Sequence, residues 1–96
     1  MSMTSLNFEW DPKKAAKNLR VHGISFDEAA TTFFDLNAIS YPDQAHSSPG
    51  DERFINLGQS TSLRLLFVVH NEEDARIRII SARRATPAEQ ATYEED

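Results

Sequence analysis

Three apolar segments in the second half of the chain constrain the fold most. They are Arg53–Gly58, Leu63–His70 and Arg76–Ala82, and each is rich in β-branched or aromatic residues. Only Gln59–Ser62 and Asn71–Ala75 separate them. A parallel pairing of neighbouring strands needs a crossover of a dozen or more residues. The sequence therefore predicts two consecutive antiparallel hairpins.

The segment before these strands predicts a short aromatic strand, Phe8–Trp10, followed by a helix from Pro12 to about Val21. Asp11 is a favourable N-cap residue, and proline is favoured at the first helical position. Gly23 fits the left-handed residue that ends many helices. Because apolar positions are few, we expect this helix on the surface with its basic side outward.

A second helix is expected to start at Ser25, where Glu28 follows three residues later and completes a capping-box pattern. Ala38–Tyr41 is a candidate short strand, and Thr86–Glu95 is expected to form a last helix capped by Thr86. The order β-α-α-β-β-β-β-α predicts an α+β fold, a small antiparallel sheet packed by helices.

Length and composition predict one globular domain over residues 1–96, with residues 1–6 flexible. Apolar residues make up 40% of the chain and charged residues 26%, which is typical of globular proteins. The longest apolar run, Leu65–Val69, is far too short to cross a bilayer. We therefore expect a cytoplasmic protein that does not enter a membrane.

Metal and thiol chemistry are not expected. The chain contains no cysteine, so disulfides and thiolate sites are excluded. Its three histidines, His22, His46 and His70, lie far apart and belong to no metal-binding motif. The prediction is therefore a protein with no cofactor and no metal.

The charge distribution leaves a nucleic-acid partner open, although the net charge is −5. Phosphate binding depends on lysine and arginine, so an acidic balance argues against it. The first predicted helix, however, contains four basic residues and no acid from Pro12 to Phe26, namely Lys13, Lys14, Lys17 and Arg20. The basic helix is thus a candidate nucleic-acid surface.

Alternation along the strands predicts where the arginines lie. Leu65, Phe67 and Val69 share one face of the middle strand, so we expect the helices to cover that face. Arg64, Arg78 and His70 would then share the open face. Arginines there can simply face water or can form a phosphate-binding surface. Arg83 breaks the alternation, which predicts either a β-bulge or a position beyond the helical cover.

Several ordered motifs resemble the BrnT family of bacterial toxins. They are the opening WDPKKAAKN with HG and FDEA after it, and the closing RIISAR with a later glutamate and YE. The resemblance implies a RelE-like ribonuclease toxin that inhibits translation and growth. It also implies a DNA-binding, BrnA-like antitoxin that neutralises the toxin in a 2:2 complex. The toxin itself would contact operator DNA only through this antitoxin.

The resemblance also implies site residues for metal-independent RNA cleavage, in which a base activates the 2′-hydroxyl and cations stabilise the phosphate. Glu52 is the implied base, and Arg64 and Arg83 are the implied phosphate stabilisers. Candidates for acid or positioning roles are His22, His46 and Tyr93. Implied RNA-binding residues are Lys13, Lys14, Lys17, Arg53 and Arg78.

Each candidate has a structural alternative. His22 can simply belong to a helix C-terminus, and His46 can be a mobile surface residue. Tyr93 can be an aromatic residue at the edge of the core, and Glu52 can be a solvated charge. Val21 stands where many relatives carry lysine, and the net charge is acidic. These departures motivate a second hypothesis, a weakly active homologue that serves mainly as an antitoxin-binding co-repressor.

Overall fold

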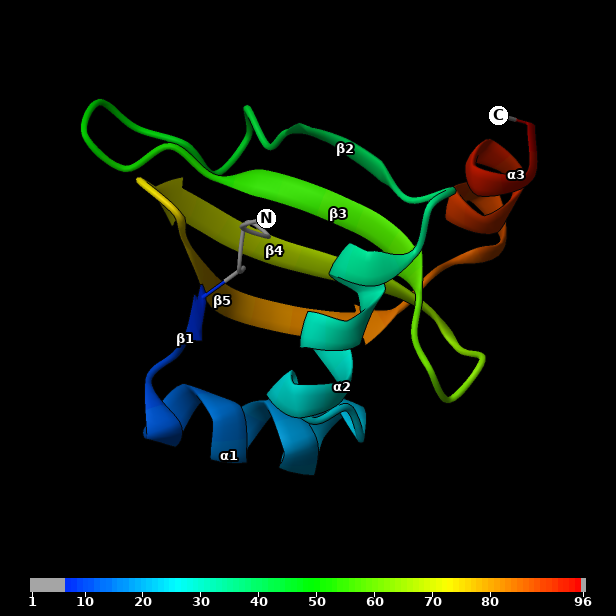
Figure 1. Cartoon of the computed structure of the whole chain (residues 1–96), viewed down its shortest axis with the longest axis horizontal. Coiled ribbons are helices and arrows are strands. Elements are labelled where there is room, and N and C mark those ends of the chain that lie inside the picture. Colours follow the sequence, from blue (N-terminus) through cyan, green and yellow to red (C-terminus); the bar gives the residue numbers. More distant parts are fainter. Residues whose placement is uncertain (1–6, 96) are drawn as a thin grey trace, which may run out of the picture.

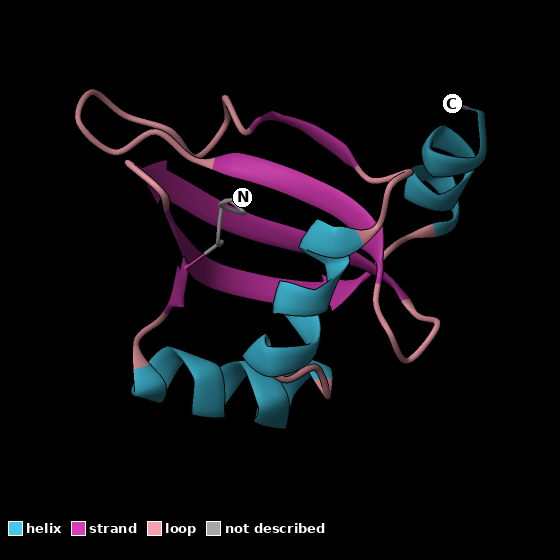
Figure 2. Ribbon diagram, in the orientation of Figure 1, coloured by secondary structure: helices cyan, strands magenta, loops and turns pink. Residues whose placement is uncertain are grey.

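The computed structural model describes residues 7–95, so the expected flexibility of residues 1–6 lies outside the described part of the chain. Figures 1 and 2 show a curved sheet with one helix across its face, one along its edge and one at its end. The elements are β1 (Asn7–Glu9), α1 (Pro12–His22), α2 (Phe26–Thr31), the 3₁₀ turn η1 (Thr32–Phe34), β2 (Ile39–Pro42), β3 (Phe54–Gln59), β4 (Leu65–Glu73), β5 (Arg76–Arg84) and α3 (Pro87–Glu95).

The sheet has five strands in the order β1-β5-β4-β3-β2. Both predicted hairpins are confirmed, because β3 pairs antiparallel with β4 and β4 with β5. The prediction of a wholly antiparallel sheet is wrong, since β1 runs parallel to β5 with Phe8 opposite Ile77. No hairpin connects β1 to β5, so no local turn fixed its direction. The fold is α+β with a mixed sheet.

The predicted helix ends are confirmed in α1 and only half confirmed in α2. Asp11 Oδ1 accepts the Lys13 N–H at 2.9 Å, and Gly23 ends α1 with φ of 71°. Ser25 Oγ accepts the Glu28 N–H at 3.0 Å, as expected of a cap. The Glu28 carboxylate, however, binds Arg64 and not the Ser25 backbone, so the capping box is incomplete.

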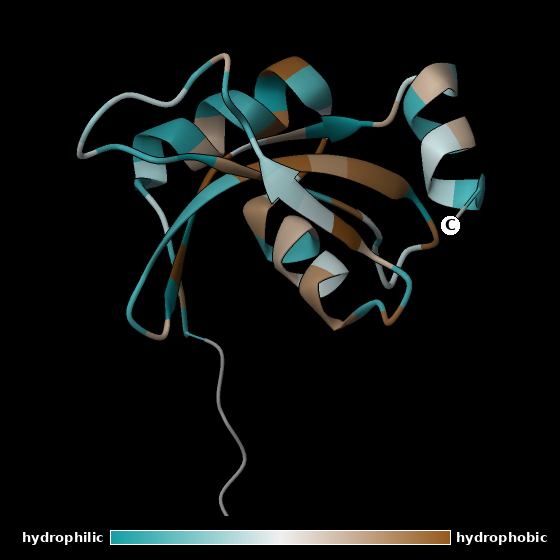
Figure 3. Ribbon diagram, turned by 90° about the horizontal axis from the view of Figure 1, so that it is seen from above, coloured by the Kyte–Doolittle hydropathy of each residue, from teal (hydrophilic) through white to brown (hydrophobic). Residues whose placement is uncertain are grey.

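The helices cover the opposite face of β4 from the one predicted. Leu66 and Val68 are fully buried in one cluster with Ile24, Phe26 and Ala29 of the α2 region and with Ile77, Ile79 and Ala82 of β5. Leu65, Phe67 and Val69 lie half-buried on the other face. β4 is apolar on both sides here, so alternation alone could not show which side the helices cover. Figure 3 shows apolar ribbon concentrated in these strands and in α2.

A β-bulge in β5 explains the position of Arg83. Val69 pairs with Ser81 and His70 with Ile79, which leaves Ile80 as an extra residue on β5. Beyond the bulge the alternation is reversed, so Arg83 lies opposite Phe67 on the face away from α2. The bulge alternative of the prediction is therefore confirmed.

The side chain of Asn18 takes the place of a neighbouring strand along the second half of β5. Its Nδ2 donates to the Ala82 carbonyl at 2.8 Å and to the Ile24 carbonyl at 2.9 Å. Its Oδ1 accepts the Ala82 N–H at 3.0 Å. This arrangement fixes the C-terminal half of α1, including His22, beside β5.

The last helix, α3, lies at one end of the sheet and has no buried residue (Figure 1). Tyr93 Oη donates to Asp35 Oδ2 at 2.7 Å, and Glu89 binds Arg83. Polar contacts, more than apolar burial, therefore hold α3 in place. None of the helices within residues 7–95 has the length and apolar character needed to cross a membrane.

Candidate functional site

The open face of the sheet carries a groove of about 380 Å³ beside the end of α1. We call it the histidine groove; its lining residues are His22, Asp43, His46, Phe67, Val69, Ser81, Ala82 and Arg83. Three of the residues predicted from the sequence, His22, His46 and Arg83, thus come together from α1, the β2–β3 loop and β5. The groove combines two imidazoles, a carboxylate and a guanidinium.

Arg83 packs over Phe67 in this groove. Its Cζ is 4.0 Å from the centroid of the Phe67 ring, a cation–π contact between two directly paired residues. Glu89 of α3 binds the guanidinium with both carboxylate oxygens, each at 2.9 Å. This hydrogen-bonded pair lowers the pKa of Glu89 and raises the pKa of Arg83. Arg83 is therefore held in one orientation as a permanent cation.

Asp43 and His46 form a carboxylate–imidazole pair at the rim of the groove. His46 Nδ1 lies 3.0 Å from Asp43 Oδ2 and 3.2 Å from Asp43 Oδ1. The Asp43 side chain is only 8% exposed, whereas that of His46 is 71% exposed. A buried carboxylate that contacts Nδ1 fixes the ring and leaves Nε2 for proton transfer. His46 is therefore oriented by a specific contact, in a loop where the sequence indicated a mobile residue.

Tyr41 of β2 adds a phenol close to these groups. Burial raises the pKa of Tyr41, and the negative charges of Glu89 and Asp43 raise it further, while Arg83 lowers it. The phenol therefore stays protonated at neutral pH, and it does not line the histidine groove.

A second groove of about 260 Å³, the lysine groove, continues from the first along α1. It is lined by Lys14, Lys17, Asn18, Val21, His22, Ile80 and Ser81, so His22 and Ser81 belong to both grooves. Of the three predicted lysines, Lys14 and Lys17 border it, and Lys13 does not. The two grooves together place basic side chains next to the histidines.

Arg64 and His70 do not lie on the open face, contrary to the prediction. Arg64 Nε donates to Glu28 Oε2 at 2.9 Å and Nη2 to Glu28 Oε1, which turns the side chain toward α2. This bond lowers the pKa of Glu28. His70 is 1% exposed between Phe33 and Phe54, and burial lowers its pKa to about 4. Both follow from the misassigned face of β4.

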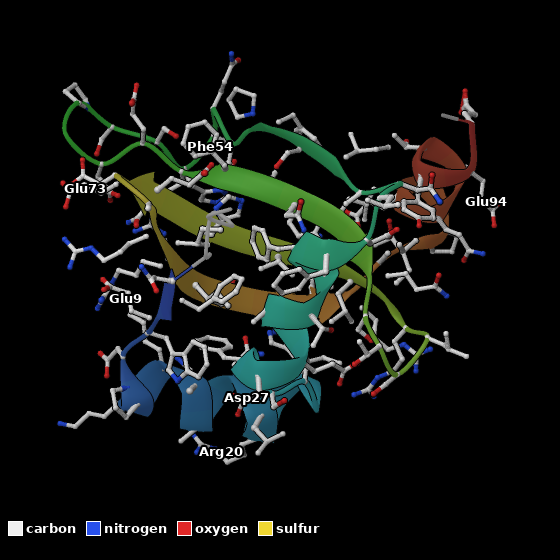
Figure 4. All side chains as sticks on the ribbon, viewed as in Figure 1. Glu9, Arg20, Asp27, Phe54, Glu73 and Glu94 are labelled. Atoms are coloured by element: carbon white, nitrogen blue, oxygen red, sulfur yellow. The ribbon has the colours of Figure 1, made fainter. Side chains whose placement is uncertain are left out.

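Glu52 lies in a separate acidic groove of about 350 Å³ at the β4–β5 turn. This groove is lined by Glu9, Gly50, Asp51, Glu52, Asn71, Glu72, Glu73, Arg76 and Arg78, none of which borders the histidine groove. Figure 4 shows Glu9 and Glu73 at this end of the sheet and Glu94 at the far end. Arg78 binds Glu9 at 3.2 Å, and Arg53 binds Asp51 at 3.3 Å. The predicted base thus stands among carboxylates, apart from Arg83.

Tyr93 is joined to Asp35 and does not line the histidine groove. The hydrogen bond to Asp35 raises the pKa of Tyr93 to about 12, with burial adding to the shift. Asp35 also accepts the Gln59 N–H at 2.8 Å, so the phenol connects α3 to the end of β3. In this position Tyr93 holds a helix in place.

Sequence reasoning missed Asp43, Tyr41 and Glu89. Asp43-x-x-His46 is a short local signal, because a carboxylate three residues before a histidine can reach its Nδ1 in a turn. The glutamate after RIISAR is part of the resemblance, but nothing in the sequence shows that it reaches Arg83. Tyr41 has no such signal; the charges of Glu89, Arg83 and Asp43 act on its phenol, which lies outside the groove lining.

Fold and groove together define a small α+β protein with two histidines and one arginine on an open sheet face. The structure is similar to the crystal structure of the ribonuclease toxin BrnT of Brucella abortus, with a TM-score of 0.66 and 26% sequence identity. The similarity covers 85% of this chain and 99% of that one.

Residues 10–89 match the family described as the ribonuclease toxin BrnT of type II toxin–antitoxin systems, and the chain belongs to this family. The resemblance seen in the sequence is thereby confirmed. No curated protein matches the sequence.

Proposed function

We propose that this protein is a metal-independent endoribonuclease toxin whose active site is the histidine groove. The observation that carries the proposal is the convergence of His22, the Asp43–His46 pair and Arg83 in one groove. Metal-free RNA cleavage needs a base, an acid and a cation at the phosphate. These side chains supply all three, in a chain that belongs to a ribonuclease toxin family.

In the proposed mechanism His46 Nε2 takes the proton of the 2′-hydroxyl, while Asp43 stabilises the imidazolium that forms. The 2′-oxygen bonds to the adjacent phosphorus, and the bond from phosphorus to the 5′-oxygen breaks. His22 gives a proton to that leaving oxygen, and the products are a 2′,3′-cyclic phosphate and a 5′-hydroxyl. Arg83 stabilises the charge of the pentavalent phosphate.

Lys14 and Lys17 are proposed to bind backbone phosphates of the RNA beside the cleaved bond. Both border the lysine groove, which joins the histidine groove at His22. Roles for Lys13, Arg53 and Arg78 in RNA binding stay predictions. The same holds for the roles of Glu52, Arg64 and Tyr93 in cleavage, which the positions of these three side chains do not support.

Cleavage of a single-stranded RNA transcript in the presence of EDTA tests the proposal. We expect His46→Ala, Asp43→Asn and Arg83→Ala each to lower the rate by about 10²- to 10⁴-fold. Arg76→Ala serves as the control, because Arg76 is an exposed arginine of the same strand outside the histidine groove. Loss of cleavage on adding EDTA would refute metal independence, and normal rates in the three variants would refute the site.

The biological partner is proposed to be a BrnA-like, DNA-binding antitoxin that neutralises the toxin in a 2:2 complex. The fold of the toxin itself is proposed to be RelE-like. Support comes from the family, whose members belong to type II toxin–antitoxin systems. Co-purification of the two chains, followed by measurement of the mass of the complex in solution, tests the partner and its stoichiometry.

One observation favours the alternative of a weakly active co-repressor: a carboxylate, Glu89, already binds Arg83. Two inductions in a bacterial host separate the functions: the wild-type chain alone, and the chain together with its antitoxin in the presence of an operator-controlled reporter. Growth arrest by the chain alone that Arg83→Ala abolishes supports the toxin. Undisturbed growth, with reporter repression that strengthens when the chain joins the antitoxin, supports the co-repressor.

A further inference from the structure

The hydrogen bonds of Arg83 leave one edge of its guanidinium available. The group has five N–H donors. Nη1 uses both of its donors, to Glu89 Oε1 at 2.9 Å and to the Arg84 carbonyl at 3.1 Å, and Nη2 uses one, to Glu89 Oε2 at 2.9 Å. The remaining two donors, on Nε and Nη2, share one edge and have no acceptor within residues 7–95. Two such parallel donors match two phosphate oxygens.

Arg64 shows the contrasting arrangement in the same protein. It also pairs with a glutamate, but Glu28 occupies the edge formed by Nε and Nη2. The edge that binds a phosphate side-on is therefore already used in Arg64 and available in Arg83. Both arginines are ion-paired with a glutamate, and the difference between them is which edge of the guanidinium the carboxylate binds.

Glu89 is itself held firmly. Its Oε1 accepts the Thr86 N–H at 2.9 Å, and its own N–H donates to Thr86 Oγ1 at 3.2 Å, which completes a capping box at the start of α3. One turn further on, Tyr93 fixes α3 to Asp35. The carboxylate is thus a fixed anchor for the guanidinium, whose Cζ lies over the Phe67 ring.

A carboxylate beside a phosphate-binding cation reduces the local positive potential, so its benefit must be geometric. An arginine side chain has several rotatable bonds, and holding it in place before the reaction avoids the loss of that freedom during the reaction. The two-point contact with Glu89 restricts the rotation of the guanidinium, and Phe67 supports it from one side.

We infer that Glu89 is a positioning residue that aims the Nε and Nη2 edge of Arg83 at the phosphate in the histidine groove. The inference rests on the proposed ribonuclease function and specifies how its phosphate stabiliser is oriented. Tyr93 acts one step further away, because it holds the helix that carries Glu89.

The test compares the kinetics of RNA cleavage by the full chain and by Glu89→Gln, Arg83→Ala and the double variant. Glu89→Gln is expected to lower kcat by about 10- to 100-fold and to change KM by less than about threefold, because the orientation of Arg83 matters most in the transition state. In the Arg83→Ala background the same change is expected to have no further effect. Glu28→Gln is the matched control, since it removes the charge from the other arginine–glutamate pair. Its kcat is expected to stay within about twofold of wild type, because that pair lies outside the histidine groove.

Three outcomes overturn the inference. An unchanged kcat in Glu89→Gln would show that Glu89 has no role in cleavage. A raised kcat would show that Glu89 inhibits Arg83. An equal loss in the Arg83→Ala background would show that Glu89 acts through another group.

A readout that needs no activity separates this inference from the proposed function. If the wild-type chain cuts no RNA, the proposed function fails, and ¹⁵N NMR of the Arg83 side chain decides the positioning role. Separate, slowly exchanging Nη signals in wild type that merge in Glu89→Gln support it. Averaged Nη signals already in wild type refute it.

Discussion

Replacing Asn18 by alanine should destabilise the protein more than any other change to a polar residue of α1. Asn18 is 6% exposed, and its amide makes three hydrogen bonds, two with Ala82 and one with Ile24. Truncation removes all three bonds and leaves a buried N–H and two carbonyls without this partner. The change therefore affects the anchoring of α1 and the free edge of β5 together.

The expected loss follows from the number of bonds. A buried hydrogen bond contributes about 1 kcal/mol net, and an unsatisfied buried group costs about 1–3 kcal/mol. Three bonds lost with partial access of water to the new gap give roughly 3–4 kcal/mol. A small domain typically has a free energy of unfolding of about 5–15 kcal/mol, and we expect a value in this range here. The predicted loss is therefore a large part of the total stability.

Urea unfolding followed by circular dichroism measures this difference. Asn37→Ala is the control, because Asn37 is exposed and its side chain makes no hydrogen bond among the described residues. We expect the control to change the free energy of unfolding by less than about 0.5 kcal/mol. A loss below about 1 kcal/mol in Asn18→Ala would refute the edge-capping role, since one solvated hydrogen bond could account for it.

Three further predictions concern stability. The folded pKa of His70, about 4, lies below its unfolded value near 6.5, so the unfolded chain binds more protons between these pH values and stability falls as pH drops through this window. The loss of up to about 3 kcal/mol should be absent in His70→Phe, and equal pH profiles in urea unfolding would contradict this. Gly58→Ala should lower the free energy of unfolding by about 1–3 kcal/mol, because a Cβ would stand 2.9 Å from the Thr32 carbonyl oxygen; an unchanged thermal midpoint would argue against this contact. Tyr93→Phe removes the hydrogen bond to Asp35 and should cost about 1 kcal/mol while raising hydrogen exchange in α3, and exchange as slow as in wild type would count against that anchor.

Features of the fold that depend on local chemistry could be predicted from the sequence. Asp11 and Gly23 cap α1 as expected, and short turns determine the two hairpins. The parallel pairing of β1 could not be predicted, because no local residue favours one direction for a strand whose partner, β5, is so distant in the sequence. The buried face of β4 was ambiguous for a different reason, since both of its faces are apolar next to β5.

The site was predictable in its residue types and less so in its arrangement. Three of the residues that the resemblance implies, His22, His46 and Arg83, do share a groove. Asp43 was missed, because its effect on His46 depends on the conformation of a loop. The prediction of Glu52 depends on the resemblance alone, and the surroundings of Glu52 depend on how the β4–β5 turn folds back beside the β2–β3 loop.

The bulge at Ile80 makes the chemistry of β5 depend on how the strand pairs as well as on its composition. If Ile80 paired with Val69 in a regular strand of the same length, Arg83 would lie opposite Leu66, on the side of the sheet that faces α2. Deleting Ile80 would instead remove the bulge and keep Ser81 opposite Val69, so Arg83 would stay opposite Phe67 in the groove. Among related chains, a one-residue gap at this point should therefore mark proteins that have a regular β5 and still keep the groove. Such gaps can be looked for before any enzyme assay is run.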